Sequence, residues 1–107
     1  MCIRDRGNRK QAVQDFDRSI ELNPGYAVAY NNRGVILYAL GNREQAIRDY
    51  EKALSLNPQY AEAYYNRAVA VFDKTGDDQA FTNDMKMAAH LGFSKAQDYL
   101  RAQGIQW

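Results

Sequence analysis

A segment of fourteen residues occurs twice in this chain, 34 residues apart, and the repetition limits the folds that are open to it. The segments Leu22–Val35 and Leu56–Val69 share ten identities, and each contains one of the two prolines. The similarity extends backwards, because residues 7–24 match residues 41–58 at nine of eighteen positions. A fixed period between about 20 and 50 residues is typical of proteins that stack one structural unit several times.

Within one period, the apolar residues follow the spacing of an α-helix in two separate runs. In the second run these residues are Ala46, Ile47, Tyr50, Ala53 and Leu54. Gly41 separates the runs and can adopt the left-handed conformation that ends a helix. Pro58 follows the second run, where its missing N–H stops a helix. The sequence therefore predicts an all-α fold built from pairs of helices.

Small residues lie beside large ones where two helices of a pair must approach each other. The small residues are Gly34, Ala46 and Ala53, and the large ones are Tyr30, Leu37 and Tyr50. This alternation, the 34-residue period and Pro58 together resemble the tetratricopeptide repeat. The stretches YNNRG and AIRDYEKAL are similar to those of bacterial members of that family. The resemblance implies a right-handed α-α superhelix, a solenoid of antiparallel helix pairs with a C-terminal capping helix.

The resemblance also divides residues 7–107 into units of one domain. It implies a partial repeat at 7–24, a repeat at 27–58, a divergent repeat at 61–92 and a capping helix at 94–104. The partial repeat contains only a second helix, expected at about Arg9–Leu22. In the divergent repeat, either Ala80 or Phe81 takes the place of Ala46. Ser94 and Gln97 have the spacing of a capping box, which predicts a last helix over residues 95–103.

The opening stretch MCIRDR, residues 1–6, resembles the translated end of an adapter used in sequencing libraries. We expect it to be a non-native leader on a truncated fragment, the alternative being a short, loosely ordered natural N-terminus. Cys2, the single cysteine, lies in this stretch. It can form neither an internal disulfide nor, by itself, a zinc site.

The composition argues against several classes of partner. Acidic and basic residues alternate and nearly balance, with a net charge of +1, whereas nucleic-acid-binding proteins concentrate positive charge on one face. No apolar run approaches the roughly 20 residues that a membrane span requires. No secretory segment opens the chain, so a cytoplasmic location is expected. We therefore expect neither nucleic acid nor a membrane as the partner.

No pattern of residues predicts catalysis, a cofactor or a metal. His90 is the only histidine, and no serine or cysteine is placed to form a nucleophile pair with it. Gly7, Gly41 and Gly76 recur near the repeat period, which indicates helix ends rather than a phosphate-binding loop. The sequence predicts that the chain is not an enzyme and needs no cofactor.

One arginine and one aspartate recur with the period and suggest a structural ion pair. Arg33 and Arg67 lie one period apart, as do Asp15 and Asp49. The planar guanidinium suits a partly buried pairing with a carboxylate. We expect Arg33 to pair with Asp15 or Asp49 on a neighbouring helix.

The resemblance places a peptide-binding groove along the first helix of each pair, on the concave side of the stack. Asn32 and Asn66 could each hold a peptide backbone group, or they could merely bond a neighbouring helix. Tyrosine and phenylalanine would supply rigid apolar area. The candidate site residues are Asn31, Asn32, Val35, Tyr38, Glu62, Tyr65, Asn66, Val69 and Phe72, with Val28, Ala39 and Asp73 beside them.

Charge suggests what such a groove would accept. Some family members hold the C-terminal carboxylate of a chaperone with cationic side chains and asparagines. Glu62 and Asn66 stand where those cations would be needed, so an acidic tail would be repelled. Glu62 and Asp73 instead favour a neutral or basic peptide.

Two alternatives to peptide binding remain open from the sequence. The chain could be a structural element that assembles with itself, because loss of the first helix would expose part of the leading helix. Its apolar residues there are Ala12, Val13, Phe16 and Ile20. It could also be a regulatory domain of a longer protein, whose number of repeats the sequence does not give.

Overall fold

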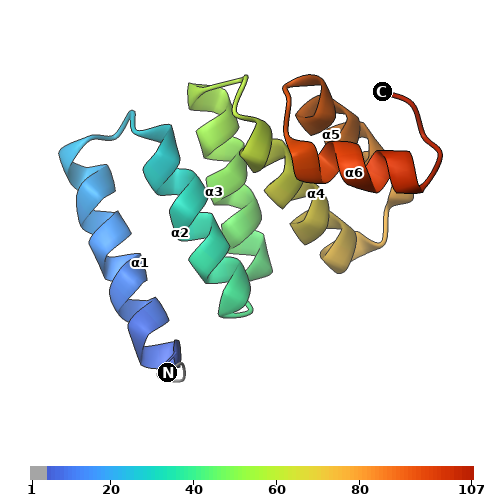
Figure 1. The fold of residues 1–107 in the computed structure, drawn as a ribbon. Helices are drawn as coiled ribbons and strands as arrows, with labels where there is room; N and C mark the ends of the chain where they lie inside the picture. Colours follow the sequence, from blue (N-terminus) through green and yellow to red (C-terminus); the bar gives the residue numbers. More distant parts are fainter. Residues whose placement is uncertain (1–4) are drawn as a thin grey trace.

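The computed structural model describes residues 5–107, which form six helices joined by short turns (Figure 1). The expected leader, residues 1–6, lies largely outside this range. Over the described residues the chain contains helices and turns only, so the all-α prediction is confirmed. The helices are α1 (Asp5–Leu22), α2 (Ala27–Ala39), α3 (Arg43–Leu56), α4 (Ala61–Thr75), α5 (Asp78–His90) and α6 (Ser94–Ala102).

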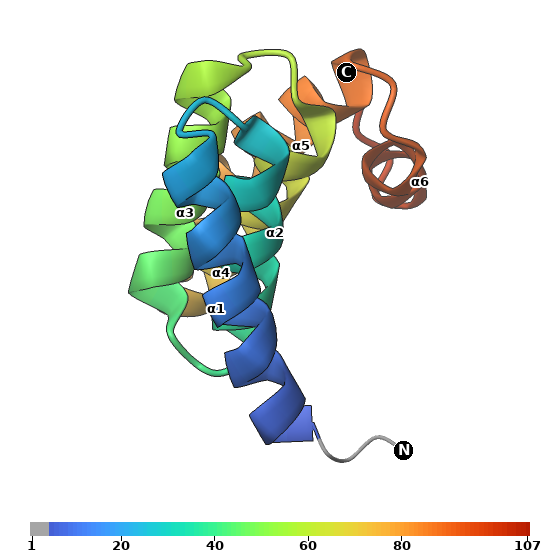
Figure 2. The same cartoon turned by 90° about the vertical axis from the view of Figure 1, so that its left-hand side faces the viewer.

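Each helix packs against the next along the chain, which produces an elongated stack of 40 × 30 × 25 Å. The closest pairs are α2 with α3 and α4 with α5, as expected for two repeats of a helical hairpin. In the end-on view of Figure 2, α3 lies on the left of the stack and α6 on the right, with α2 and α4 between them. The predicted solenoid of antiparallel helix pairs is thus confirmed. No described helix is long and apolar enough to cross a membrane.

The turns between the helices lie where the sequence places them. After α1 the Asn23 side-chain oxygen accepts a hydrogen bond from the Gly25 N–H, and after α3 the Asn57 side chain does the same for Gln59, so both proline-containing turns share one geometry. Gly41 has φ 91°, a left-handed conformation that costs glycine little. The turns that the sequence predicts at Gly41 and at the two prolines are therefore confirmed.

The core between α2 and α3 depends on Gly34. A Cβ atom added at Gly34 would lie 2.6 Å and 2.9 Å from two ring carbons of Tyr50 and 3.2 Å from the Ala46 carbonyl oxygen. Tyr50 is 2% exposed and Ala46 is fully buried, so neither has room to move. The glycine therefore lets the Tyr50 ring lie directly against the backbone of α2.

The third unit solves the same packing problem with a different pair of residues. Ala68 stands one period after Gly34, and Met85 takes the place of Tyr50; both are buried in one cluster. Helix α4 extends to Thr75, and Asp84 and Met85 keep a 35-residue offset from their counterparts in α3. With this offset, Phe81 rather than Ala80 takes the position of Ala46.

Several expectations about the terminal helices need correction. Helix α1 begins at Asp5 rather than Arg9. The capping box at Ser94 is wrong, because Phe93 is the N-cap residue and no side chain caps α6. Gln97 instead donates from Nε2 to the Ala89 carbonyl oxygen at 2.9 Å and ties α6 to α5. The last helix is Ser94–Ala102, one residue earlier at each end than expected.

The apolar face of α1 is half-buried rather than bare. Val13 packs on the cluster of Leu37, Ala46 and Tyr50. The other apolar side chains of this face, Ala12, Phe16 and Ile20, are also partly covered. They are nevertheless less buried than the counterparts of Ala12 and Phe16 one period later, which are almost fully buried.

The repeated arginine forms the predicted ion pairs. Arg33 donates to both carboxylate oxygens of Asp49, at 2.8 Å and 2.7 Å, and Arg67 does the same to Asp84 at 2.9 Å for each bond. Arg33 also reaches Asp17 of α1 at 2.9 Å. The expected alternative partner Asp15 is wrong; it accepts from Gln11 on the helix surface. Two-point pairing with a carboxylate is the strong form of this interaction.

The contact of Gly34 with Tyr50 predicts a specific rescue. Gly34→Ala should lower the free energy of unfolding by about 1–2 kcal/mol, because overpacking outweighs the better helix propensity of alanine. Adding Tyr50→Met, which copies the Ala68–Met85 pair, should recover most of that loss. Urea denaturation of the four members of this double-mutant cycle measures it. Strictly additive effects of the two substitutions would contradict the proposed contact.

Candidate functional site

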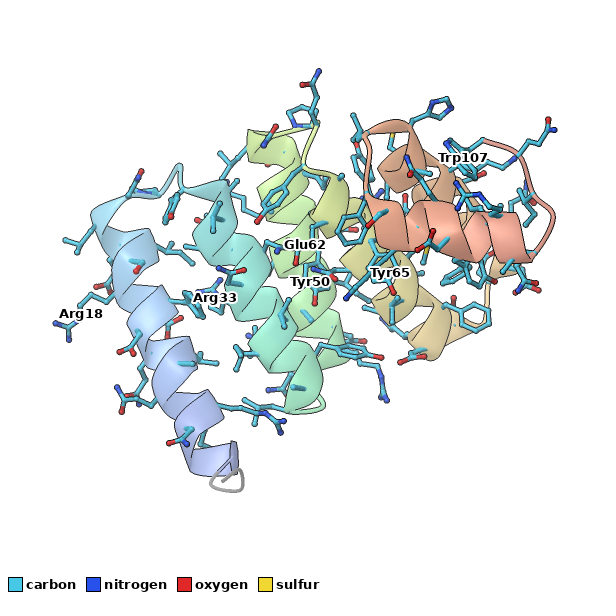
Figure 3. The ribbon with its side chains drawn as sticks, viewed as in Figure 1. Arg18, Arg33, Tyr50, Glu62, Tyr65 and Trp107 are labelled. Carbon is cyan, nitrogen blue, oxygen red and sulfur yellow. The ribbon has the colours of Figure 1, made fainter. Side chains whose placement is uncertain are left out.

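A small notch opens on the stack between α2 and α4, on the side of the first helix of each pair. Its cavity volume is about 180 Å³. Figure 3 shows Tyr50 and Tyr65 in this region of the front face, whereas Arg33 lies between α1 and α2. The lining residues are Val35 and Tyr38 from α2, Tyr50 from α3, and Tyr65, Asn66 and Val69 from α4. Five of these six belong to the groove that the sequence predicts.

The notch forms because equivalent faces of two successive first helices lie side by side. Val35 and Tyr38 are three residues apart on α2, and Tyr65 and Val69 are four apart on α4. Such spacings place side chains on one face of a helix. A repeat period of 34 residues then brings the two faces together, so the site follows directly from the repeat.

Asn66 is held in position by a second asparagine. Its Nδ2 donates to Oδ1 of Asn31 at 3.1 Å, across the junction of α2 and α4. Asn31 is fully buried, so its expected place in the groove is wrong and it serves to position Asn66. The side-chain oxygen Oδ1 of Asn66 accepts no hydrogen bond from the side chain of another described residue. It is therefore free to accept one from a peptide N–H.

Tyr50 forms the floor of the notch. Burial raises the pKa of its hydroxyl above the ordinary value of 10.0, and Tyr38, Asp49 and Glu62 add to the shift through their charges. The groove predicted from the sequence contains only residues of the first helices. Tyr50 lies on α3, a second helix, and so is not among them. The signal that could have found it is Gly34, because a tyrosine ring that passes over a glycine reaches across α2.

The lower end of the notch is closed by a network of polar side chains. The Tyr38 hydroxyl donates to Asp73, which is the first cause of the raised pKa of Tyr38. Arg43 approaches Asp73 at 4.0 Å, and Lys74 pairs with Glu44 at 3.0 Å. These contacts join the end of α2 and the start of α3 to the end of α4.

Three other predicted site residues lie outside the notch. Asn32, which lies one period before Asn66, is half-buried and does not line the notch. Glu62 is exposed in the first turn of α4 and has no ion-pair partner among the described residues. Phe72 stacks on Phe81 of α5 with ring centroids 5.1 Å apart, so it extends the surface toward α5 and α6.

Aromatic side chains line the corresponding junction between α4 and α6. Tyr99 stands 33 residues after Asn66, at the equivalent position of α6. Its ring meets that of Phe81 edge-on, with centroids 5.3 Å apart. Tyr65 and Phe93 also pack together, with centroids 5.1 Å apart. This junction thus has aromatic contacts where the junction between α2 and α4 has the notch.

His90, the one histidine, is exposed at the last position of α5. Within residues 5–107, no group of three or more histidine, cysteine, aspartate and glutamate side chains could hold a metal ion. The lining of the notch itself offers hydrogen-bonding side chains and apolar surface.

Comparison with protein families supports the same organisation. Two models described as tetratricopeptide repeat match residues 27–60 and 49–79, and a model described as TPR repeat matches residues 3–41. No curated protein sequence matches the chain at a significant level.

Several solved structures are similar to the chain. The crystal structure of MamA is 29% identical with a TM-score of 0.73, and the match covers 84% of this chain and 52% of that one. A second MamA structure is 31% identical with a TM-score of 0.69, covering 83% and 48%. The first TPR of Spaghetti (RPAP3), bound to the HSP90 peptide SRMEEVD, is 23% identical with a TM-score of 0.80, covering 91% and 78%. The chain thus spans about half the length of the MamA structures.

The buried hydroxyl of Tyr50 predicts a loss of stability at alkaline pH. Its pKa is raised in the folded state, so its contribution to stability is complete below pH 10.0 and falls as the pH rises and the unfolded chain ionises. By about pH 11 the wild type should lose about 1 kcal/mol more free energy of unfolding than Tyr50→Phe. Urea denaturation at neutral pH and at about pH 11 measures the difference. Tyr26→Phe, at an exposed tyrosine, is the matched control and should behave as the wild type; equal losses in all three proteins would contradict the assignment.

Proposed function

Because the chain belongs to the tetratricopeptide-repeat family, we propose that it is a protein-interaction module that binds an extended segment of a partner protein across α2 and α4. The observation that carries the proposal is the notch. In it, Asn66 is fixed by the buried Asn31, while the side-chain oxygen Oδ1 of Asn66 has no partner among the described side chains. A side chain that is already ordered loses little entropy when it binds. A non-catalytic role agrees with this family.

The geometry of the notch suits a peptide in extended conformation. Val35, Tyr65 and Val69 offer apolar area, and the Asn66 carbonyl oxygen offers an acceptor for a backbone N–H. Exposed Val28 and Phe72 continue the surface beyond the notch at either end. The structure of Spaghetti (RPAP3) with its peptide supports the proposal to the extent that the same fold can hold a peptide.

The charges favour a neutral or basic segment over an acidic C-terminal tail. Glu62 is exposed beside the notch with no ion-pair partner in residues 5–107, and Asp73 lies at the other end of the notch. A carboxylate placed between them would be repelled. We therefore do not extend the acidic peptide SRMEEVD of the structural neighbour to this chain.

A second candidate function is self-assembly through α1. The half-buried state of Ala12 and Phe16, whose counterparts Ala46 and Tyr50 are 0% and 2% exposed, supports a contact at this end of the stack. Burial of a large apolar side chain contributes about 1.5–3 kcal/mol. Light scattering separates the candidates, because a monomer that binds peptides favours the first and a dimer sensitive to Phe16→Asp favours the second. A regulatory domain in a longer protein is compatible with either.

Substitution of the two asparagines should have unequal effects on binding. For peptides selected from a displayed library of random 12-residue segments, Asn66→Ala should weaken affinity about five- to tenfold through loss of a buried hydrogen bond. Asn32→Ala should change it less than about twofold, because Asn32 lies outside the notch. Calorimetric titration measures both. Asn83→Ala, at an exposed asparagine of α5, is the control, and an Asn66→Ala variant that is folded yet binds like the wild type would remove Asn66 from the site.

Charge at the peptide terminus should alter affinity in a defined direction. The peptide SRMEEVD with a free carboxylate should bind more weakly than its amidated form, and a version with both glutamates replaced by lysine should bind most tightly. Fluorescence polarisation of the three labelled peptides gives the order. The reverse order would contradict the preference for neutral or basic segments while leaving peptide binding itself intact.

A further inference from the structure

The notch has the size and the lining of a pocket for one long side chain. Its volume of about 180 Å³ corresponds to about six water molecules. The walls are apolar, with Val35 and Val69 on opposite helices, and three tyrosine rings surround the space. A long aliphatic stem fits such walls, and a polar end group fits the hydroxyls.

The charged groups around the notch are mostly acidic. Glu62 lies three and four residues before Tyr65 and Asn66, on the same face of α4, and Figure 3 shows it near Tyr50. It has no ion-pair partner among the described residues. Asp73 is bonded by Tyr38 and partly balanced by Arg43, the one cation that faces this network from α3. No lysine or arginine lines the notch. The electrostatic field inside it is therefore negative on the side of Glu62.

Two other tyrosines of the repeats have a cationic side chain over the ring, which the tyrosines of the notch do not have among the described residues. Arg33 lies over the Tyr30 ring at 5.6 Å from its centroid, and Arg67 lies over Tyr64 at 5.7 Å. Cations at this distance from the face of an aromatic ring are attracted by its quadrupole. Tyr65 has no such cation from the described part of the chain, although it lies in the same repeat. Its ring contacts Phe93 and also lines the notch, where a cation supplied by a partner can reach it.

We propose that the notch receives the side chain of one lysine or arginine of the bound segment, with its stem between Val35 and Val69 and its charged end directed to Glu62. This inference rests on the proposed function and names the residue that the site selects. The charge is matched by Glu62 and by the tyrosine rings, and the backbone beside it is held by Asn66. An acidic side chain is repelled at the same place, and an uncharged one gains only the apolar contact.

The test uses four acetylated and amidated pentapeptides that differ only at the centre. These are GAKAG, GARAG, GAEAG and a form with norleucine, which keeps the stem of lysine and lacks its charge. Titrations followed by NMR report binding through the side-chain amide of Asn66 and the ring of Tyr65. We expect the lysine and arginine peptides to bind about three- to fivefold more tightly than norleucine, and the glutamate peptide most weakly.

Substitution of Glu62 separates the charge from the fit. Glu62→Gln should reduce the affinity for the lysine peptide to that of norleucine and leave norleucine unchanged. Because Glu62 is exposed, the variant should fold normally, and the circular dichroism spectrum checks this. Glu21→Gln, at an exposed glutamate near the end of α1, is the matched control and should keep the wild-type preference. High salt should diminish the preference in the wild type by screening the charges.

The outcomes distinguish this inference from the function on which it rests. Equal binding of lysine and norleucine, or a preference that survives Glu62→Gln, overturns the cation pocket. If library-selected peptides bind and lose affinity with Asn66→Ala while no pentapeptide perturbs the notch, the pocket is again overturned and the peptide-binding function stands. If neither class of peptide binds, both proposals fail.

Discussion

The contact between Gly34 and the Tyr50 ring is the constraint on which both the fold and the site depend. Because no Cβ separates them, α2 and α3 approach closely enough to bury Tyr50 to 2% exposure. The same ring then extends past α2 and forms the floor of the notch against α4. The third unit, with Ala68 and Met85 instead, packs equally well but has no phenol to offer. A residue chosen for helix packing thus also determines the chemistry of the surface.

The ion pairs explain why the notch is left without a cation. Arg33 lines a different cavity, beside α1, where Asp17 and Asp49 take up its donors. Asp49 is 5% exposed, and a carboxylate buried to this degree would be strongly destabilising without its partner. Arg67 is committed to Asp84 in the same way. The arginines of both first helices are therefore used inside the stack, and Lys74 pairs with Glu44 at the surface. Among the described residues, the acidic Glu62 remains without a cationic partner.

The sequence predicts correctly the features whose residues recur in each repeat. It does not predict the contacts of a residue that has a different environment in each repeat. Helix limits, turns and the pairing of Arg33 with Asp49 follow from repeated residues, since a repeated role produces a repeated side chain. Asn31 was assigned to the groove by its repeat position, but it points into the junction with α4, which only the packing of two units defines. The predicted capping box at Ser94 does not form, because the Gln97 side chain donates to the Ala89 carbonyl oxygen of α5 instead. Neither competing partner is local in sequence.

The two junctions of the stack differ in the side chains that line them. Between α4 and α6, Phe81 stands where α3 has Ala46 and Tyr99 stands where α4 has Asn66, and the two rings contact each other. Aromatic pairs contribute about 0.5–1.5 kcal/mol beyond the area they bury, which helps to hold α6 against α5. Between α2 and α4, the small residue and the asparagine leave an open notch in which Val35, Tyr65 and Val69 are only partly covered. This uncovered apolar area is the physical support for the proposal that a partner segment occupies the notch.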